Sequence, residues 1–179
     1  MSASNIAATS PANSQAWAED IWRDNIQRRA PVLYVLAYGA NAAGKDDLPM
    51  EQYRTELDQV LARFRQTLPD AGCLLIGPAD FYVKDDAGQW NVEPRVDPVL
   101  QIQRELAKDH DCAFWDTRAF MGGRETMAAW TEAGLARSDH LHFSPLGYTY
   151  MGAMLTDALL APFDAPVGEE SSQASTGAP

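Results

Sequence analysis

The stretch VLYVLAYGAN, residues 32–41, decides the fold of this chain. Its first seven residues form a nearly continuous apolar run, which is typical of a parallel strand that is covered on both faces. The run ends at Gly39, and Asn41 follows almost directly. Reactive groups in open parallel sheets lie outside the carboxyl ends of the strands, so this turn is the first place where we expect a functional residue.

The segments on either side of this run alternate between helical and strand patterns. Apolar residues recur at the spacing of an amphipathic helix in four segments, and short apolar runs separate them. The expected helices span residues 14–29, 50–68, 95–108 and 145–160, and the expected strands span residues 32–38, 73–76 and 113–115. This alternation predicts an α/β fold with a parallel sheet and right-handed crossovers.

Two segments are expected to lack long regular elements. Residues 79–94 should form a long loop with an exposed turn at Asp85 to Gly88, and residues 117–135 should form a loop with short helices. In the last helix, we expect five apolar residues to point inward. They are Leu146, Tyr150, Met154, Leu155 and Leu159.

The chain has 179 residues, of which 25 are Asp or Glu and 14 are Lys or Arg, so its formal net charge is −11. Hydrophobic residues make up 46%, which is enough for the core of one domain. The acidity argues against a protein that coats nucleic acid or an anionic membrane. No apolar run approaches the ~20 residues of a membrane span, and no signal peptide is visible. Cys73 and Cys112 show no CxxC spacing, so we interpret both as small buried residues.

A second polar block, DHLHFSPLGY at residues 139–148, opens the last helix. An Asp three residues before a His can hold the imidazole in one tautomer and stabilise its charged form. An Asn after a strand can donate its amide to a developing oxyanion. Taken singly, these patterns are more often a turn and a helix cap, and Ser144 before Pro145 suits an N-cap.

Together and in this order, the two blocks resemble those of the SGNH hydrolases, also called GDSL-type esterases and lipases. Gly39-Ala40-Asn41 is similar to the Gly-x-Asn block of that family, which implies that Asn41 is an oxyanion residue. Asp139 and His142 resemble its Asp-x-x-His block, which implies that they are the last two members of a catalytic triad. Residues 121–123 and the 139–148 block look like the branch that contains peptidoglycan-associated and carbohydrate O-acetylesterases.

The resemblance covers roughly residues 30–160 and implies a three-layer α/β/α, flavodoxin-like fold. The five-stranded sheet of the family has the order 2-1-3-4-5, and this chain resembles only strands three to five, so we expect an incomplete sheet of three strands. We divide the chain into a lead-in and helix (1–29), an SGNH hydrolase-like domain (30–163) and a disordered tail (164–179).

The family's Gly-Asp-Ser block, whose Ser is the nucleophile, has no counterpart in this sequence. No Gly precedes Gly39, so the backbone donor of the family's second block is also unmatched. We therefore expect this chain alone to be inactive or nearly so. The strand at 32–38 would be an open apolar edge, which invites pairing with a dimer mate or with a missing N-terminal segment.

The resemblance implies an ester hydrolase that acts on an O-acetylated carbohydrate or a cell-wall glycan, with His142 as base and without a metal or organic cofactor. The alternative is a non-catalytic remnant, or a subunit that pairs through its edge strand with a chain that supplies the missing half. Family members that act on cell-wall glycan are periplasmic or secreted, but this sequence leaves the compartment undecided.

The remaining polar residues have mostly structural interpretations. Trp90 lies in the expected loop on the side of the site and is a candidate for stacking on a sugar ring. His110 is expected to cap a helix C-terminus, and Asp116 a helix N-terminus. His140 and His142 could bind a metal on an extended segment, but too few other ligand residues lie near them in sequence, so we predict no metal site.

Overall fold

The structure is a computed structural model, and it describes residues 19–164. The lead-in, the first part of the helix expected at 14–29 and the tail after residue 164 lie outside the described residues. The helices are α2 (Glu19–Arg29), α3 (Ala40–Ala43), α4 (Met50–Thr67), α5 (Val96–Asp109), α6 (Thr117–Met121), α7 (Met127–Glu132) and α8 (Pro145–Asp164). The strands are β1 (Leu33–Ala37), β2 (Gly72–Ile76), β3 (Tyr82–Lys84), β4 (Trp90–Val92) and β5 (Ala113–Trp115).

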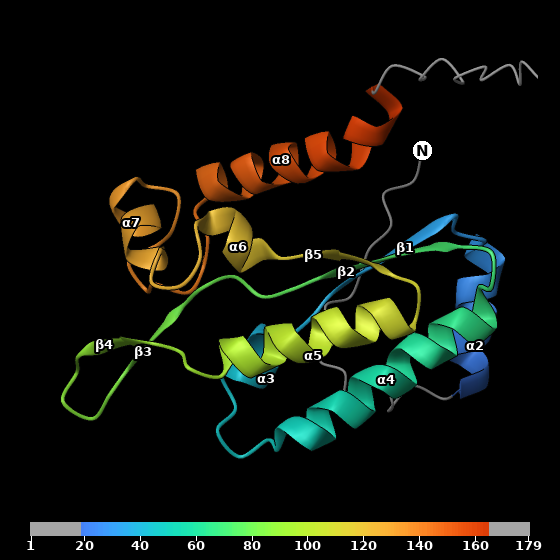
Figure 1. Cartoon of the computed structure of the whole chain (residues 1–179), viewed down its shortest axis with the longest axis horizontal. Helices are drawn as coiled ribbons and strands as arrows, with labels where there is room; N and C mark the ends of the chain where they lie inside the picture. Colours follow the sequence, from blue (N-terminus) through green and yellow to red (C-terminus); the bar gives the residue numbers. More distant parts are fainter. Residues whose placement is uncertain (1–18, 165–179) are drawn as a thin grey trace, which may run out of the picture.

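Strands β1, β2 and β5 form a parallel sheet in that order, which confirms the predicted α/β fold. Val35 of β1 lies beside Leu74 of β2, and Leu74 lies beside Ala113 of β5. Helices α4 and α5 lie on one side of the sheet and α8 on the other (Figure 1). Because the strands are parallel, their carboxyl ends lie at one end of the molecule.

The hydrophobic core lies between the sheet and helices α4 and α5. Tyr53 and Leu57 of α4 and Val99 of α5 are fully buried, and Tyr34 and Leu36 of β1 pack in the same cluster. The intervening positions at the ends of β1, residues 33 and 37, are exposed. Alternate residues of a strand point to opposite faces, so the expectation that this strand is covered on both faces is wrong.

Helix α8 begins where it was predicted, but its apolar residues do not all point inward. Leu146 is 61% exposed, and Tyr150 and Leu159 are also exposed, whereas Met154 and Leu155 are half-buried. The ring of Tyr150 still lies 5.7 Å from that of Phe120, so the first half of the helix is anchored by aromatic contacts. No helix within residues 19–164 is long and apolar enough to cross a membrane.

The expected loop at 79–94 contains an antiparallel hairpin, β3–β4, that the sequence analysis missed. The turn between its strands was predicted: Asp85 Oδ1 accepts hydrogen bonds from the backbone N–H groups of Ala87 and Gln89. Gly88 has a φ of +78°, which glycine adopts without a steric penalty. Strands of only three residues carry too little alternation to be recognised in a sequence.

Cys73 and Cys112 form a disulfide, which corrects our interpretation of them as separate buried residues. Cys73 lies in β2, and Cys112 directly precedes the neighbouring β5. Pairing of these two strands brings the Cα atoms within 4.6 Å, although 39 positions separate the residues in the sequence.

Candidate active site

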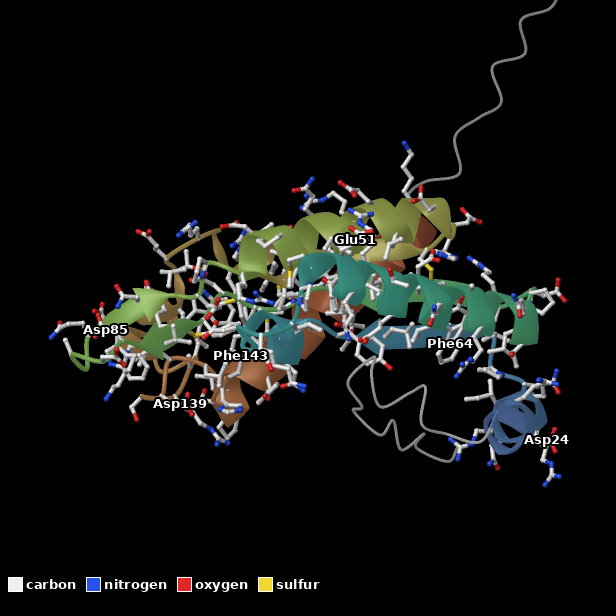
Figure 2. All side chains as sticks on the ribbon, turned by 90° about the horizontal axis from the view of Figure 1, so that it is seen from below. Asp24, Glu51, Phe64, Asp85, Asp139 and Phe143 are labelled. Carbon is white, nitrogen blue, oxygen red and sulfur yellow. A yellow bond between two sulfur atoms is a disulfide. The ribbon has the colours of Figure 1, made fainter. Side chains whose placement is uncertain are left out.

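The carboxyl ends of the sheet strands lead into α3, α6 and the β3–β4 hairpin, and α7 and the start of α8 lie at the same end (Figure 1). Both polar blocks of the sequence are found here. Asn41 lies in α3, directly after β1, and residues 139–142 lie in the loop before α8. Figure 2 shows Asp139 at the same end of the molecule as Phe143 and Asp85.

Asp139 and His142 form the pair that their spacing predicts. Asp139 Oδ2 lies 3.0 Å from His142 Nδ1, and Asp139 Oδ1 accepts backbone hydrogen bonds from Leu141 and His142. The backbone N–H of His142, and then its imidazole, lower the pKa of Asp139 to about 2. The carboxylate is therefore ionised at neutral pH and can hold Nδ1 in its protonated form. This tautomer leaves the lone pair on Nε2, on a side chain that is 55% exposed.

Backbone contacts fold the loop around this pair back onto itself. The N–H of Arg137 donates to the carbonyl of His142 over 2.8 Å, and Ala136 pairs with Phe143. Ser144 Oγ accepts from the N–H of Gly147 at the start of α8, which confirms its predicted role as N-cap. The hydroxyl of Ser144 also donates to the carbonyl of Gly134, so this group acts both as a donor and as an acceptor at the start of α8.

Asn41 is exposed at the first turn of α3. Within residues 19–164 it makes no hydrogen bond to Asp139 or His142, so the structure places it at the same end of the sheet without direct contact. Gly39 sets its position: this residue has a φ of +116°, and a Cβ there would lie 2.8 Å from Gln103 Nε2. Only glycine fits this turn without strain.

Gln103 of helix α5 contacts the turn around Gly39, a role that was not predicted from the sequence. Its side chain is fully buried, and Nε2 donates to the carbonyl of Tyr38 and to the hydroxyl of Tyr53. A polar residue on the buried stripe of an amphipathic helix is a signal that could have drawn attention to it. The amide thus links helix α5 to Tyr38, the residue that follows β1 and directly precedes Gly39.

We expect Gln103→Leu to lower the free energy of unfolding by about 1–3 kcal/mol, because the carbonyl of Tyr38 would lose its buried donor. Amide exchange at Ala43, whose N–H donates to the carbonyl of Gly39, should also accelerate. Gln101→Leu on the exposed side of the same helix is the control, and its effect should be within about 0.5 kcal/mol. Equal effects of the two variants would contradict this role of Gln103.

Trp90 lies beside the loop that carries the Asp139–His142 pair. Its ring is 4.8 Å from that of His140, and it remains 38% exposed. The ammonium of Lys84 lies 4.7 Å from the centre of the Trp90 ring. The hairpin also binds the backbone of this loop, because the N–H of Tyr82 donates to the carbonyl of His140 over 3.0 Å. The β3–β4 hairpin therefore packs against the loop that carries Asp139 and His142, and the ring of Trp90 remains partly exposed beside that loop.

The other polar candidates have the structural roles expected of them. Asp116 caps α6 through a 2.9 Å hydrogen bond from the N–H of Ala119. His110 follows the last residue of α5, and its Nε2 lies 2.7 Å from Asp58 Oδ1. In the part of the chain that the structure describes, no group of three or more His, Cys, Asp or Glu side chains is arranged to hold a metal ion.

Comparison with known proteins adds a family match and several similar structures. The model of the GDSL-like lipase/acylhydrolase family matches residues 2–150. A peptidoglycan O-acetylesterase is 28% identical with a TM-score of 0.79, and the match covers 88% of this chain and 45% of that protein. No curated protein matches the sequence.

Two other similar structures have lower identity and inform on the fold alone. An acetyl xylan esterase is 17% identical with a TM-score of 0.63, over 86% of this chain and 78% of that one. An acetylxylan esterase from Geobacillus stearothermophilus is 19% identical with a TM-score of 0.59, over 89% of this chain and 69% of that one. The chain thus spans most of the length of these two proteins, but less than half of the peptidoglycan O-acetylesterase.

Proposed function

Because the chain belongs to the GDSL-like lipase/acylhydrolase family, we propose that it serves in ester hydrolysis and contributes Asp139, His142 and Asn41 to the active site. The Asp139–His142 pair carries this proposal. An ionised carboxylate that holds Nδ1 of an exposed imidazole leaves Nε2 free to act as a general base.

The proposed chemistry is acyl transfer through a hydroxyl nucleophile. The hydroxyl oxygen attacks the carbonyl carbon of the ester while its proton moves to His142 Nε2, and the oxyanion of the tetrahedral intermediate accepts a hydrogen bond from the amide of Asn41. His142 then gives the proton to the departing alcohol. Water, deprotonated by the same imidazole, releases the acid in the second half of the cycle.

We place the ester on a carbohydrate, as an O-acetyl group of a polysaccharide or cell-wall glycan. The similarity to a peptidoglycan O-acetylesterase supports this class of substrate. The exposed ring of Trp90, next to the catalytic loop, supplies an apolar surface of the kind on which sugar rings stack.

We further propose that the nucleophile comes from a segment that pairs with the open edge of β1. Among residues 19–164, this strand lies at one edge of the sheet, and the preceding Val32 is 88% exposed. An apolar edge presents unpaired backbone groups to another strand. Helix α8 lies on the side of the sheet opposite α4 and α5 (Figure 1), and its exposed apolar residues, among them Leu146 and Leu160, add apolar surface that such a segment could cover.

The same edge favours a second candidate function, that of a non-catalytic subunit that pairs with another chain. Either role predicts an assembly, so light scattering of the purified chain should detect a dimer or larger species. A clean monomer would count against pairing through the β1 edge.

The disulfide bears on the compartment. Such bonds persist in oxidising environments and are rare in the cytosol. It supports a periplasmic or secreted location, which the sequence left undecided.

Binding of an O-acetylated peptidoglycan fragment tests the function without requiring turnover. We expect saturation-transfer NMR to detect the acetyl methyl group on the wild-type chain, and the de-O-acetylated fragment to bind more weakly. Trp90→Ala should weaken binding by about 2–10-fold, the usual effect of losing an aromatic contact. Equal binding of both fragments would contradict the proposed substrate.

Turnover of p-nitrophenyl acetate tests the origin of the nucleophile. We expect the purified chain to show no more turnover than His142→Ala. Clear activity that His142→Ala abolishes would show that the chain supplies its own nucleophile, and it would support ester hydrolysis while contradicting the external segment.

A further inference from the structure

Asp80 is a fully buried carboxylate in the segment that follows β2, and the proposed chemistry does not use it. It follows the strand after the Gly77-Pro78 turn. Its Oδ2 atom accepts hydrogen bonds from the backbone N–H groups of Thr126 and Met127, at 3.0 and 3.3 Å. Burying a charge is costly unless hydrogen bonds compensate it, so a carboxylate in this place calls for an explanation.

The contacts of Asp80 fix the start of helix α7. Thr126 occupies the N-cap position of this helix, but its own side chain makes no capping hydrogen bond. Asp80 supplies the missing acceptor from the segment between β2 and β3, 46 positions away in the sequence. Tyr82 reinforces this link, because its hydroxyl donates to the carbonyl of Glu125.

Helix α7 in turn carries the loop of the Asp139–His142 pair. The carbonyl of Trp130 accepts from the N–H groups of Leu135 and Ala136 at 2.8 and 3.0 Å. The hydroxyl of Thr131 donates to Met127 O and lies 3.3 Å from His140 Nδ1. Hydrogen bonds from helix α7 therefore hold the loop that contains Asp139 and His142.

We propose that Asp80 is a positioning residue: by capping α7, it holds the loop in which Asp139 orients His142. This inference rests on the proposed role of that pair in catalysis. Asp80 does not touch the pair. It links the segment that follows β2 to the short helix α7, which precedes the loop.

The tautomer of His142 reports on this positioning without any turnover. In the wild-type chain at pH 8, long-range ¹H–¹⁵N NMR should show the neutral ring of His142 with its proton on Nδ1, the atom that faces Asp139. Asp80→Leu should shift the ratio of the Nδ1–H to the Nε2–H form by about threefold or more, as expected for loss of an exposed charged contact. Asp80→Asn retains an oxygen acceptor for α7 and should keep the wild-type ratio.

His110 is an internal control in the same spectra. Its Nε2 faces Asp58 of helix α4 and not the Asp139–His142 loop, so its tautomer should not change. If Asp80→Leu does not fold, Thr131→Val, which removes the hydroxyl next to His140, should shift the His142 ratio in the same direction. If Asp80→Leu folds and leaves the tautomer ratio of His142 unchanged, the positioning role is overturned. If Asp80→Leu does not fold, an unchanged ratio in Thr131→Val overturns it. A wild-type His142 that already prefers Nε2–H would instead contradict the catalytic pair.

Discussion

Reduction of the Cys73–Cys112 disulfide should lower the free energy of unfolding by about 4 kcal/mol, as estimated from the entropy of closing a loop of this length. The bond joins positions 39 residues apart, and the enclosed segment includes the β3–β4 hairpin and helix α5. Reduction frees this segment in the unfolded chain and so favours unfolding. Domains are commonly stable by about 5–15 kcal/mol, so the bond would account for a large share of the total. Urea unfolding followed by circular dichroism, with and without a phosphine reductant, measures the difference.

The Cys73→Ala/Cys112→Ala double variant separates this effect from others of the reductant. It should resemble the reduced wild-type chain in stability and should not respond to the reductant at all. A wild-type chain whose unfolding midpoint is the same under oxidising and reducing conditions would show that the bond does not stabilise the fold.

The elements of the sheet could be predicted because their signals are local. The apolar run of β1 and the helical stripe of α4 each bury their own residues against one core, and the observed bounds lie within a few residues of those expected. The prediction for α8 was wrong about which residues are buried. The apolar spacing of a helix indicates which residues share a face, but not whether another element covers that face. Leu146 and Leu159 are apolar and suitably spaced, yet they are exposed where the described residues leave the second face partly open.

In the candidate site, too, local contacts could be predicted from the sequence and long-range contacts could not. Asp139 and His142 are three positions apart, and the turn between them is enough to bring their side chains into contact, so their pairing was predictable. Gln103 and Asp80 act on segments 65 and 46 positions away. Such contacts depend on how the helices pack, which no local pattern specifies. The disulfide was missed for the same reason.

Gly147→Ala should destabilise the chain by about 3 kcal/mol, at the upper end of the usual cost of overpacking. Gly147 is buried in the first turn of α8, and a Cβ at this position would lie 1.9 Å from the carbonyl oxygen of Leu135. That oxygen is part of the backbone and already accepts the N–H of Ser144, so it cannot move aside cheaply. The first turn of the helix must shift instead, and the Asp139–His142 loop is joined to it. Urea unfolding measures the loss of stability.

Gly152 provides the matched control in the same helix. It is exposed, and a Cβ there would meet no atom within 4 Å. Alanine is favoured over glycine inside a helix by up to ~1 kcal/mol, so Gly152→Ala should stabilise the chain. The two substitutions are chemically identical and should have opposite signs, because only the first forces a methyl group against the backbone of the loop before α8. If both were stabilising, the close approach of α8 to Leu135 would be wrong, and with it the support that this helix gives to the loop of His142.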